Sequence, residues 1–231
     1  QAFPRCIQHY DYPDVLEETP ELNRFFSSNS QFSWLDSRTL FVILQLLAPK
    51  RVIEIGGGFP TLLTADVNRR FLAGAVEFTC VEPYPRDFLT RPIAGLNTLV
   101  CQRAQDLPLD FFASLEKNAI LFIDSSHVSK TGSDVNYLVF EILPRLKPGV
   151  FIHFHDVFLP HEYPQEWVLG EHRSWNEQYL LRAMLMYSTI YKVFFGCAYA
   201  YLNYSGLIEQ ALGLASGKAY VGGSLWLEKV A

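Results

Sequence analysis

Histidines and aspartates gather in two short stretches of the sequence. Asp124 and His127 belong to the run IDSSH, and His155 and Asp156 close the run HFHD. Imidazoles and carboxylates can transfer protons, and together they can ligate a divalent metal ion. Both runs directly follow an apolar stretch that is typical of a buried strand. If those two strands are neighbours in one sheet, Asp124, His155 and Asp156 form one polar cluster at its edge.

A glycine triplet marks a second place where a ligand could bind. Gly56, Gly57 and Gly58 separate the β-branched run VIEI from a helical pattern that starts at Pro60. Glycine tolerates positive φ and lets a ligand approach bare main chain, and proline is compatible with the first turn of a helix. The pattern predicts a small-molecule site, with a tight strand-to-helix turn without a ligand as the alternative.

Two acidic residues indicate which ligand such a loop would take. Glu54 precedes the glycines, and Glu82 follows the apolar run FTCV. A carboxylate can accept hydrogen bonds from both hydroxyls of a ribose, and it favours a nearby ammonium group. A dinucleotide site would require G-x-G-x-x-G, but Thr61 occupies the third glycine position, which disfavours hydride transfer. The run H-x-H-D at 153–156 also lacks the offset and the last histidine of the metallohydrolase pattern H-x-H-x-D-H.

The elements that must position these residues alternate along the chain. Apolar strands that alternate with helices predict a mostly parallel sheet covered on both faces, a doubly wound three-layer α/β/α sandwich. Two further strand-like runs near the C-terminus predict an antiparallel pair, which makes a seven-stranded sheet. The expected strands are 51–55, 78–81, 98–101, 119–123, 150–154, 191–196 and 224–229, and the expected helices are 36–47, 60–72, 109–115, 134–146 and 176–187.

The sequence divides into a short N-terminal segment and one domain. Residues 1–35 are rich in Pro, Ser, Asn and aromatic residues, and they predict a cap with one short helix at 15–26. Residues 36–231 predict the domain, and Asp36 is expected to cap its first helix. An insertion near 198–223 carries no motif and leaves room for an acceptor-binding loop or for self-association.

Composition and charge exclude several classes of partner. Hydrophobic residues make up 49% of the chain and charged residues 19%, which favours a packed globule over long disordered tracts. The net charge of -5, without a cluster of Lys and Arg, argues against nucleic acid as a partner. No run of about 18 apolar residues points to a membrane. The four cysteines are widely spaced, which favours a cytoplasmic location with reduced thiols.

The sequence resembles the class I S-adenosylmethionine-dependent methyltransferases, whose first motif has the form E/D-x-G-x-G and whose second strand ends in an acidic residue. The run EIGGG at 54–58 and the acidic Glu82 carry this resemblance, which covers roughly residues 36–160. The resemblance implies a Rossmann-like fold and S-adenosylmethionine as cofactor, with adenine near Gln105 or Asp106. It also implies contacts from Glu54, Gly56 and Gly58 to the methionine portion, from Glu82 to the ribose, and from Asp124 to the cofactor.

Among these enzymes the chain is similar to the metal-dependent O-methyltransferases, in which an Asp after strand four and a residue pair after strand five hold a divalent cation. Asp124, His155 and Asp156 match those positions, although His155 departs from the Asp-Asn or Asp-Asp pair of the family. The imidazole either moves the preference away from Mg²⁺ or indicates hydrogen-bonded polar residues without a metal.

His127 matches a position where that family carries a catalytic lysine. The resemblance implies that His127, with the usual imidazole pKa of about 6.5, takes the proton of the acceptor, and that His155 and Asp156 act with it. Anchoring of the loop is the alternative for His127.

The activity that the resemblance implies is methyl transfer to an oxygen of a small molecule such as a sugar or a phenol. Such a transfer requires donor and acceptor to be aligned, so loops around the glycine triplet would supply much of the rate. Because a fold alone does not prove chemistry, a non-catalytic ligand-binding domain and an NAD-type oxidoreductase are the alternatives.

Overall fold

The computed structural model describes residues 2–32, 34–215 and 222–231. Its centre is a seven-stranded sheet in the order β3-β2-β1-β4-β5-β7-β6. The strands from β3 to β5 are parallel, whereas β7 runs antiparallel to both β5 and β6. This arrangement confirms the predicted mostly parallel sheet with an antiparallel C-terminal pair. The strands are β1 (Arg51–Ile55), β2 (Glu77–Val81), β3 (Thr98–Val100), β4 (Ile120–Ile123), β5 (Phe151–Phe154), β6 (Tyr191–Gly196) and β7 (Leu225–Lys229).

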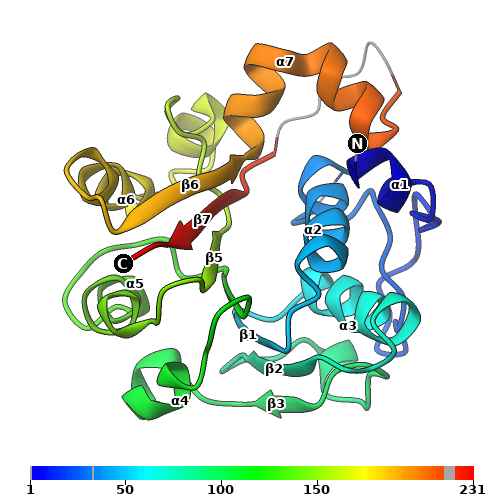
Figure 1. Ribbon diagram of the computed structural model, residues 1–231, viewed down its shortest axis with the longest axis horizontal. Helices are drawn as coiled ribbons and strands as arrows, with labels where there is room; N and C mark the ends of the chain where they lie inside the picture. The colour runs from blue at the N-terminus through cyan, green and yellow to red at the C-terminus, as the bar shows by residue number, and fades with distance from the viewer. Residues whose placement is uncertain (1, 33, 216–221) are drawn as a thin grey trace.

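Helices cover both faces of the sheet, which confirms the three-layer sandwich (Figure 1). One face packs against α1 (Ala2–Ile7), α2 (Trp34–Leu47), α3 (Phe59–Phe71) and α7 (Cys197–Leu212). The other face packs against α4 (Leu109–Ala113), α5 (Asp134–Tyr137) with the helical turns that continue it to Arg145, and α6 (Glu177–Met186).

The central strands are mainly apolar because both of their faces are buried. Every residue of β4 and β5 is buried, and successive residues point into different hydrophobic clusters. On β1, for example, Val52 joins the cluster under α2 and α3, whereas Ile53 and Ile55 join the cluster on the opposite face. Strands of this kind fix their register firmly, because a shift by one residue would exchange the two faces. The loops at the carboxyl ends of β1, β2, β4 and β5 are therefore held in place.

The predicted helix at 15–26 is wrong. These residues are irregular, and the N-terminal segment has its helix at α1 instead. Pro20 lies inside the predicted helix, where it removes a backbone hydrogen bond and clashes with the preceding turn. Phe25 and Phe26 are adjacent, yet both are buried against the core of α2 and α3. The aromatic residues thus fold the segment onto the domain without needing a helix.

The described part of the C-terminal insertion is mostly helical. The predicted insertion at 198–223 contains α7, which begins directly after β6 and ends at Gly213 with positive φ. Residues 216–221 of that prediction lie outside the described residues.

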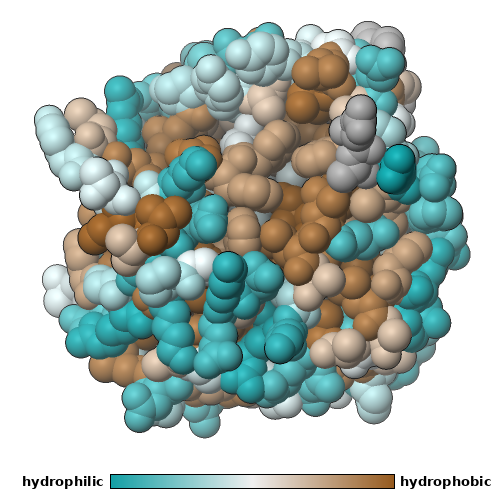
Figure 2. Space-filling view, in the orientation of Figure 1, coloured by the Kyte–Doolittle hydropathy of each residue, from teal (hydrophilic) through white to brown (hydrophobic). Residues whose placement is uncertain are grey.

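In the view of Figure 2, apolar side chains gather in the middle of the face, and hydrophilic side chains surround them. Among the described residues, no helix has both the length and the apolar character that a membrane crossing needs.

Candidate functional site

Two adjoining cavities lie at the carboxyl edge of the sheet, where open α/β sheets bind ligands. The first has a volume of about 370 Å³ and extends past β2 and β4, and the second has a volume of about 720 Å³ and extends towards β5. The same residues line the boundary between them, so the two cavities form one groove, called the ligand groove below. These boundary residues are Gly56, Glu82, Asp124, Ser125 and Ser126.

The glycine loop forms the floor of the ligand groove. Gly56 has a φ of +87°, and a Cβ atom there would lie 1.9 Å from the carbonyl oxygen of Asp124. Gly57 also lacks room, since a Cβ atom would lie 2.7 Å from the Sγ atom of Cys80. Gly58, which was predicted to contact the methionine portion, lines neither cavity, and a Cβ atom there would meet nothing closer than 3.6 Å. The structure therefore requires glycine at 56 and 57. Gly57, to which the resemblance assigned no cofactor contact, lies in the wall of the second cavity.

The backbone N–H groups of the glycine loop are already bonded within the protein. Gly56 donates to the carbonyl oxygen of Val81 at 3.0 Å, and Gly57 donates to Oε2 of Glu82 at 2.9 Å. Gly58 donates to Oγ1 of Thr61 at 3.0 Å. A pyrophosphate needs free N–H groups at such a loop. The loop is therefore unsuited to a dinucleotide. This agrees with the sequence, in which Thr61 occupies the third glycine position of the dinucleotide motif.

Glu82 lies between the two cavities, where a ribose is expected. Its Oε1 atom accepts a hydrogen bond from the backbone N–H of Tyr84 at 2.8 Å, while Oε2 accepts the one from Gly57. Each carboxylate oxygen has a further lone pair, so the side chain can still accept two hydroxyl groups. Of the two adenine candidates, Gln105 lines the first cavity, whereas Asp106 is paired with Arg103 at the surface at 2.8 Å.

Glu54 does not reach the ligand groove. Its side chain is buried under the glycine loop, on the same side of the sheet as Thr61 and Cys80, and it is not among the residues that line either cavity. Burial raises the pKa of Glu54 well above its ordinary value, against a smaller opposing effect of the Thr61 hydroxyl. The predicted direct contact of Glu54 with the methionine portion is therefore corrected to a position below the loop.

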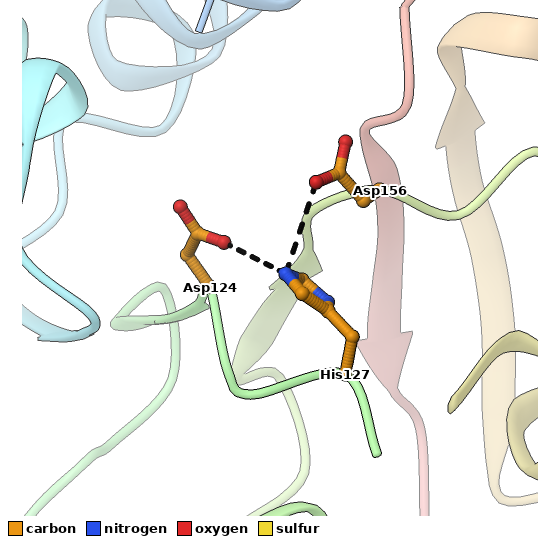
Figure 3. A group of neighbouring side chains, drawn as sticks. All are labelled: Asp124, His127 and Asp156. Carbon is orange, nitrogen blue, oxygen red and sulfur yellow. Dashed lines mark ion pairs between the residues drawn. The ribbon is translucent and has the colours of Figure 1, made fainter. Parts of the chain in front are cut away.

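Asp124, His127 and Asp156 converge on the second cavity (Figure 3). The Nε2 atom of His127 lies 3.2 Å from Oδ1 of Asp124 and 3.7 Å from Oδ2 of Asp156. One ligand atom from each side chain lies within 4.8 Å of the others, which is close enough for a single metal ion. We call these three residues the Asp-His-Asp cluster. It arises because the loops after β4 and β5 leave neighbouring strands at the same edge.

The charges of the Asp-His-Asp cluster are strongly coupled. Burial opposes ionisation of Asp124, but the imidazoles of His155 and His127 outweigh it and hold the pKa of Asp124 well below its ordinary value. Burial likewise opposes protonation of His127, but hydrogen bonds to Asp124 and Glu177 raise the pKa of His127 to about 9. The expectation of an ordinary imidazole pKa for His127 is therefore corrected, because three carboxylates surround the ring.

His155 joins the predicted cluster from behind. Its Nδ1 atom lies 3.3 Å from Oδ2 of Asp156 and 3.5 Å from Oδ1 of Asp124, and the residue is only 2% exposed. Its Nε2 atom lies 3.9 Å from Oδ2 of Asp36. Asp36 was expected to cap a helix, but it accepts hydrogen bonds from the backbone N–H groups of Gly223 and Ser224 instead. His155 thus lies among carboxylates, and both His155 and His127 line the second cavity although both are buried.

His127 is held by residues that are distant in sequence. Its Nδ1 atom lies 3.1 Å from Oε2 of Glu177, and its ring lies 4.2 Å from the ring of Trp175. Glu177 also accepts a hydrogen bond from the Ser125 hydroxyl at 3.0 Å. Sequence reasoning missed Glu177, because an acidic residue in the first turn of a helix is normally explained by the helix dipole.

The outer wall of the second cavity is aromatic and charged. Trp167 and Trp175 both line it. The guanidinium of Arg173 lies 4.1 Å from the centre of the Trp167 ring and 4.5 Å from that of Trp175, and it pairs with Glu171 at 2.6 Å. Cation–π contacts of this kind keep both indoles in fixed positions. The second cavity thus has an aromatic and charged wall beside the Asp-His-Asp cluster.

The strand order and the ligand groove beside the glycine loop define the class I methyltransferase fold. Residues 53–157 match the model of a family described as a methyltransferase domain. This segment is less than half of the chain, but it contains the glycine loop, Glu82 and the Asp-His-Asp cluster.

The chain is similar to one O-methyltransferase of known structure in its fold and to other proteins more weakly or in sequence. The O-methyltransferase TomG from Streptomyces achromogenes, involved in tomaymycin synthesis and solved in complex with SAM, is 13% identical with a TM-score of 0.50, over 99% of this chain and 88% of TomG. The O-methyltransferase from Bacillus cereus in complex with SAH is 15% identical with a TM-score of 0.48, over 85% of this chain and 82% of that one. An uncharacterized protein from Archaeoglobus fulgidus is 38% identical over 133 residues, which are 54% of this chain and 58% of that protein. The chain thus spans less than two thirds of this relative.

Proposed function

We propose that this protein transfers the methyl group of S-adenosylmethionine to an oxygen of a small-molecule acceptor. The observation that carries the proposal is the ligand groove, in which bare glycine backbone and Glu82 adjoin the Asp-His-Asp cluster. The match of residues 53–157 to a methyltransferase domain supports the donor, and so does the fold shared with TomG, which was solved with SAM. The cluster supports an oxygen acceptor, because its groups can bind and deprotonate a hydroxyl.

The first cavity and Glu82 fit the nucleoside part of this donor. The cavity volume of about 370 Å³ lies in the range of small-molecule sites. Gln105 offers an amide in its wall, and Glu82 offers two carboxylate oxygens at its boundary with the second cavity. When bound, S-adenosylmethionine would supply an electrophilic methyl group on a positively charged sulfur. The negative charges of Glu82 and Asp124 favour that positive charge at the boundary.

Glu82 gives the direct test of donor binding. We expect Glu82→Gln to weaken S-adenosylhomocysteine by about 10- to 100-fold in isothermal titration, because an amide replaces a charged acceptor of the ribose hydroxyls. Glu77→Gln is the matched control, since Glu77 starts the same strand but pairs with Arg51 at the surface. Because Glu82 also accepts the Gly57 N–H, a small decrease in melting temperature is expected as well. Equal affinities of wild type and Glu82→Gln would show that the ribose does not lie at Glu82.

The donor set of the Asp-His-Asp cluster fits a divalent cation. Asp124 and Asp156 each contribute a carboxylate oxygen, and His127 contributes Nε2. We propose that His127 takes the ligand position that was predicted for His155, which lines the same cavity with its Nδ1 atom 3.3 Å from Oδ2 of Asp156. A cation held there would lower the pKa of an acceptor hydroxyl. Nε2 of His127 would then be occupied as a ligand. Asp124 would orient that hydroxyl, and the carboxylate oxygen of Asp156 that does not bind the cation is the proposed site that takes its proton.

Removal of metal tests this part of the proposal. We expect methyl transfer to fall by at least about 10-fold after dialysis against EDTA and to return on addition of Mn²⁺, Co²⁺ or Zn²⁺. Binding of S-adenosylhomocysteine, measured in parallel, should change little, because His127 and Asp156 do not line the first cavity. Full activity in excess chelator would leave the cluster as a metal-free binding site for the acceptor.

Other properties enter as parts of the same proposal. We expect a small-molecule acceptor, a cytoplasmic location and no binding of nucleic acid or membranes. Residues 36–231 would form the methyltransferase domain, and residues 1–35 would cap it, since Ser30 and Gln31 line the second cavity. Self-association through α7 is the expectation for the insertion, since this helix exposes Leu202 and Leu207.

A further inference from the structure

Glu177 is a buried carboxylate that the methyl-transfer scheme does not use. It begins α6, 50 residues after His127, and it is 1% exposed. Its Oε1 and Oε2 atoms both lie 3.0 Å from the Ser125 hydroxyl, and Oε2 lies 3.1 Å from Nδ1 of His127. A buried carboxylate is costly unless hydrogen bonds compensate it. Both of its partners lie on the loop after β4 that carries Asp124.

The contact with Glu177 determines which nitrogen of His127 faces the cavity. An ionised carboxylate only accepts hydrogen bonds, so the proton must lie on Nδ1 for the contact to be favourable. In the neutral ring, Nε2 then carries the lone pair. Nε2 is the atom that points at Asp124 and Asp156 (Figure 3). The ring is therefore oriented as a metal ligand requires, with Nε2 towards the carboxylates of the cavity and Nδ1 towards Glu177.

The backbone holds Glu177 in this place independently of its charge. The N–H groups of Asn176 and Glu177 both donate to the carbonyl oxygen of His127, at 3.0 and 3.2 Å. The Asn176 side chain accepts a hydrogen bond from the N–H of Ser129 at 2.6 Å. The start of α6 is thus fastened to the loop that carries His127. A change of the Glu177 side chain can therefore alter the imidazole without detaching the helix.

We propose that Glu177 is a positioning residue that fixes His127 with Nδ1 protonated and thereby makes the Asp-His-Asp cluster a nitrogen-containing site for a transition metal ion. The inference rests on the metal site of the proposed function. Metal-bound histidines usually donate their other ring N–H to a carboxylate, which increases the basicity of the ligand. One imidazole and two carboxylates suit Mn²⁺, Fe²⁺, Co²⁺ or Zn²⁺ better than Mg²⁺, which prefers oxygen ligands.

The test measures metal binding without donor or acceptor. Apo-protein is titrated with Co²⁺, Zn²⁺ and Mg²⁺, with calorimetry for all three and visible absorption for Co²⁺. We expect the wild type to bind Co²⁺ and Zn²⁺ more tightly than Mg²⁺, and Glu177→Gln to lose about 10- to 100-fold of the Co²⁺ affinity. Glu162→Gln is the matched control, because Glu162 bonds the Tyr179 hydroxyl of the same helix at the surface and should bind Co²⁺ as the wild type does. A Co²⁺ affinity of Glu177→Gln within twofold of wild type, or no binding to wild type, overturns the inference.

A second measurement needs no variant and applies even if Glu177→Gln does not fold. In ¹⁵N-histidine NMR spectra of the Zn²⁺-loaded wild type, we expect His127 to carry its proton on Nδ1 and to bind Zn²⁺ through Nε2. The opposite arrangement overturns the role of Glu177. The two proposals can fail separately. If the wild type does not bind S-adenosylhomocysteine but the metal data are as expected, only the methyltransferase proposal is rejected. Normal S-adenosylhomocysteine binding with unchanged metal affinity in Glu177→Gln rejects this inference alone.

Discussion

Gly56→Ala will destabilise the protein and abolish measurable binding of S-adenosylhomocysteine. The added methyl group would lie 1.9 Å from the carbonyl oxygen of Asp124, and the φ of +87° is unfavourable for alanine. The backbone penalty is about 1 to 2 kcal/mol, and overpacking of a tight site adds about 1 to 3 kcal/mol. For a chain of this size, this corresponds to a decrease in melting temperature of about 5 to 15 °C. The loop must move to relieve the overlap, and the floor of the ligand groove moves with it.

Gly58→Ala is the control for this prediction. A Cβ atom at position 58 would make only ordinary contacts, with the side chain of Gln31 at 3.6 Å and with Pro60 at 3.7 Å. Loss of glycine before the first turn of α3 should cost at most about 1 kcal/mol. Thermal unfolding and titration with S-adenosylhomocysteine are measured on both variants. If Gly56→Ala melts and binds like Gly58→Ala, the close approach of the glycine loop to β4 is not a constraint on the protein.

The fold could be predicted from the sequence because its signals are local. The runs at 51–55 and 150–154 are mainly apolar on both faces, which is the pattern of strands buried on both faces. The predicted helix at 15–26 failed for the opposite reason. Phe25 and Phe26 are fixed by long-range packing against α2 and α3. The sequence around them has no periodicity from which this packing could be predicted.

The candidate site was predictable where it follows strand ends. Asp124, His155 and Asp156 end neighbouring parallel strands, so their closeness follows from the topology. Glu177 was not predictable, because it reaches His127 only after the chain has passed over β5 and returned at α6. The raised pKa of His127 was equally hidden, since it depends on this partner and on Asp124 together.

Asp124→Asn will decrease methyl transfer by about 10²- to 10⁴-fold per folded molecule, the range usually found when a group needed for proton transfer is removed. Asp124 lines both cavities, and its carboxylate faces Nε2 of His127 and Nδ1 of His155. Asparagine has the same shape but no charge. It therefore removes a metal-ligand oxygen and a partner of two imidazoles without creating a void. We expect the free energy of unfolding to fall by about 1 to 3 kcal/mol, because a buried charged hydrogen bond is lost.

The loss of turnover in Asp124→Asn must be separated from any loss of folded protein. Asp110→Asn, at an exposed position in the first turn of α4, makes the same chemical change away from the ligand groove and should leave turnover and unfolding as in the wild type. Turnover is divided by the folded fraction obtained from unfolding curves, and S-adenosylhomocysteine affinity is measured on the same samples. A purely structural aspartate would lose turnover only in proportion to the folded fraction. If Asp124→Asn keeps more than about a third of wild-type turnover on this basis, the proton leaves the acceptor without Asp124, and the Asp-His-Asp cluster does not carry the chemistry.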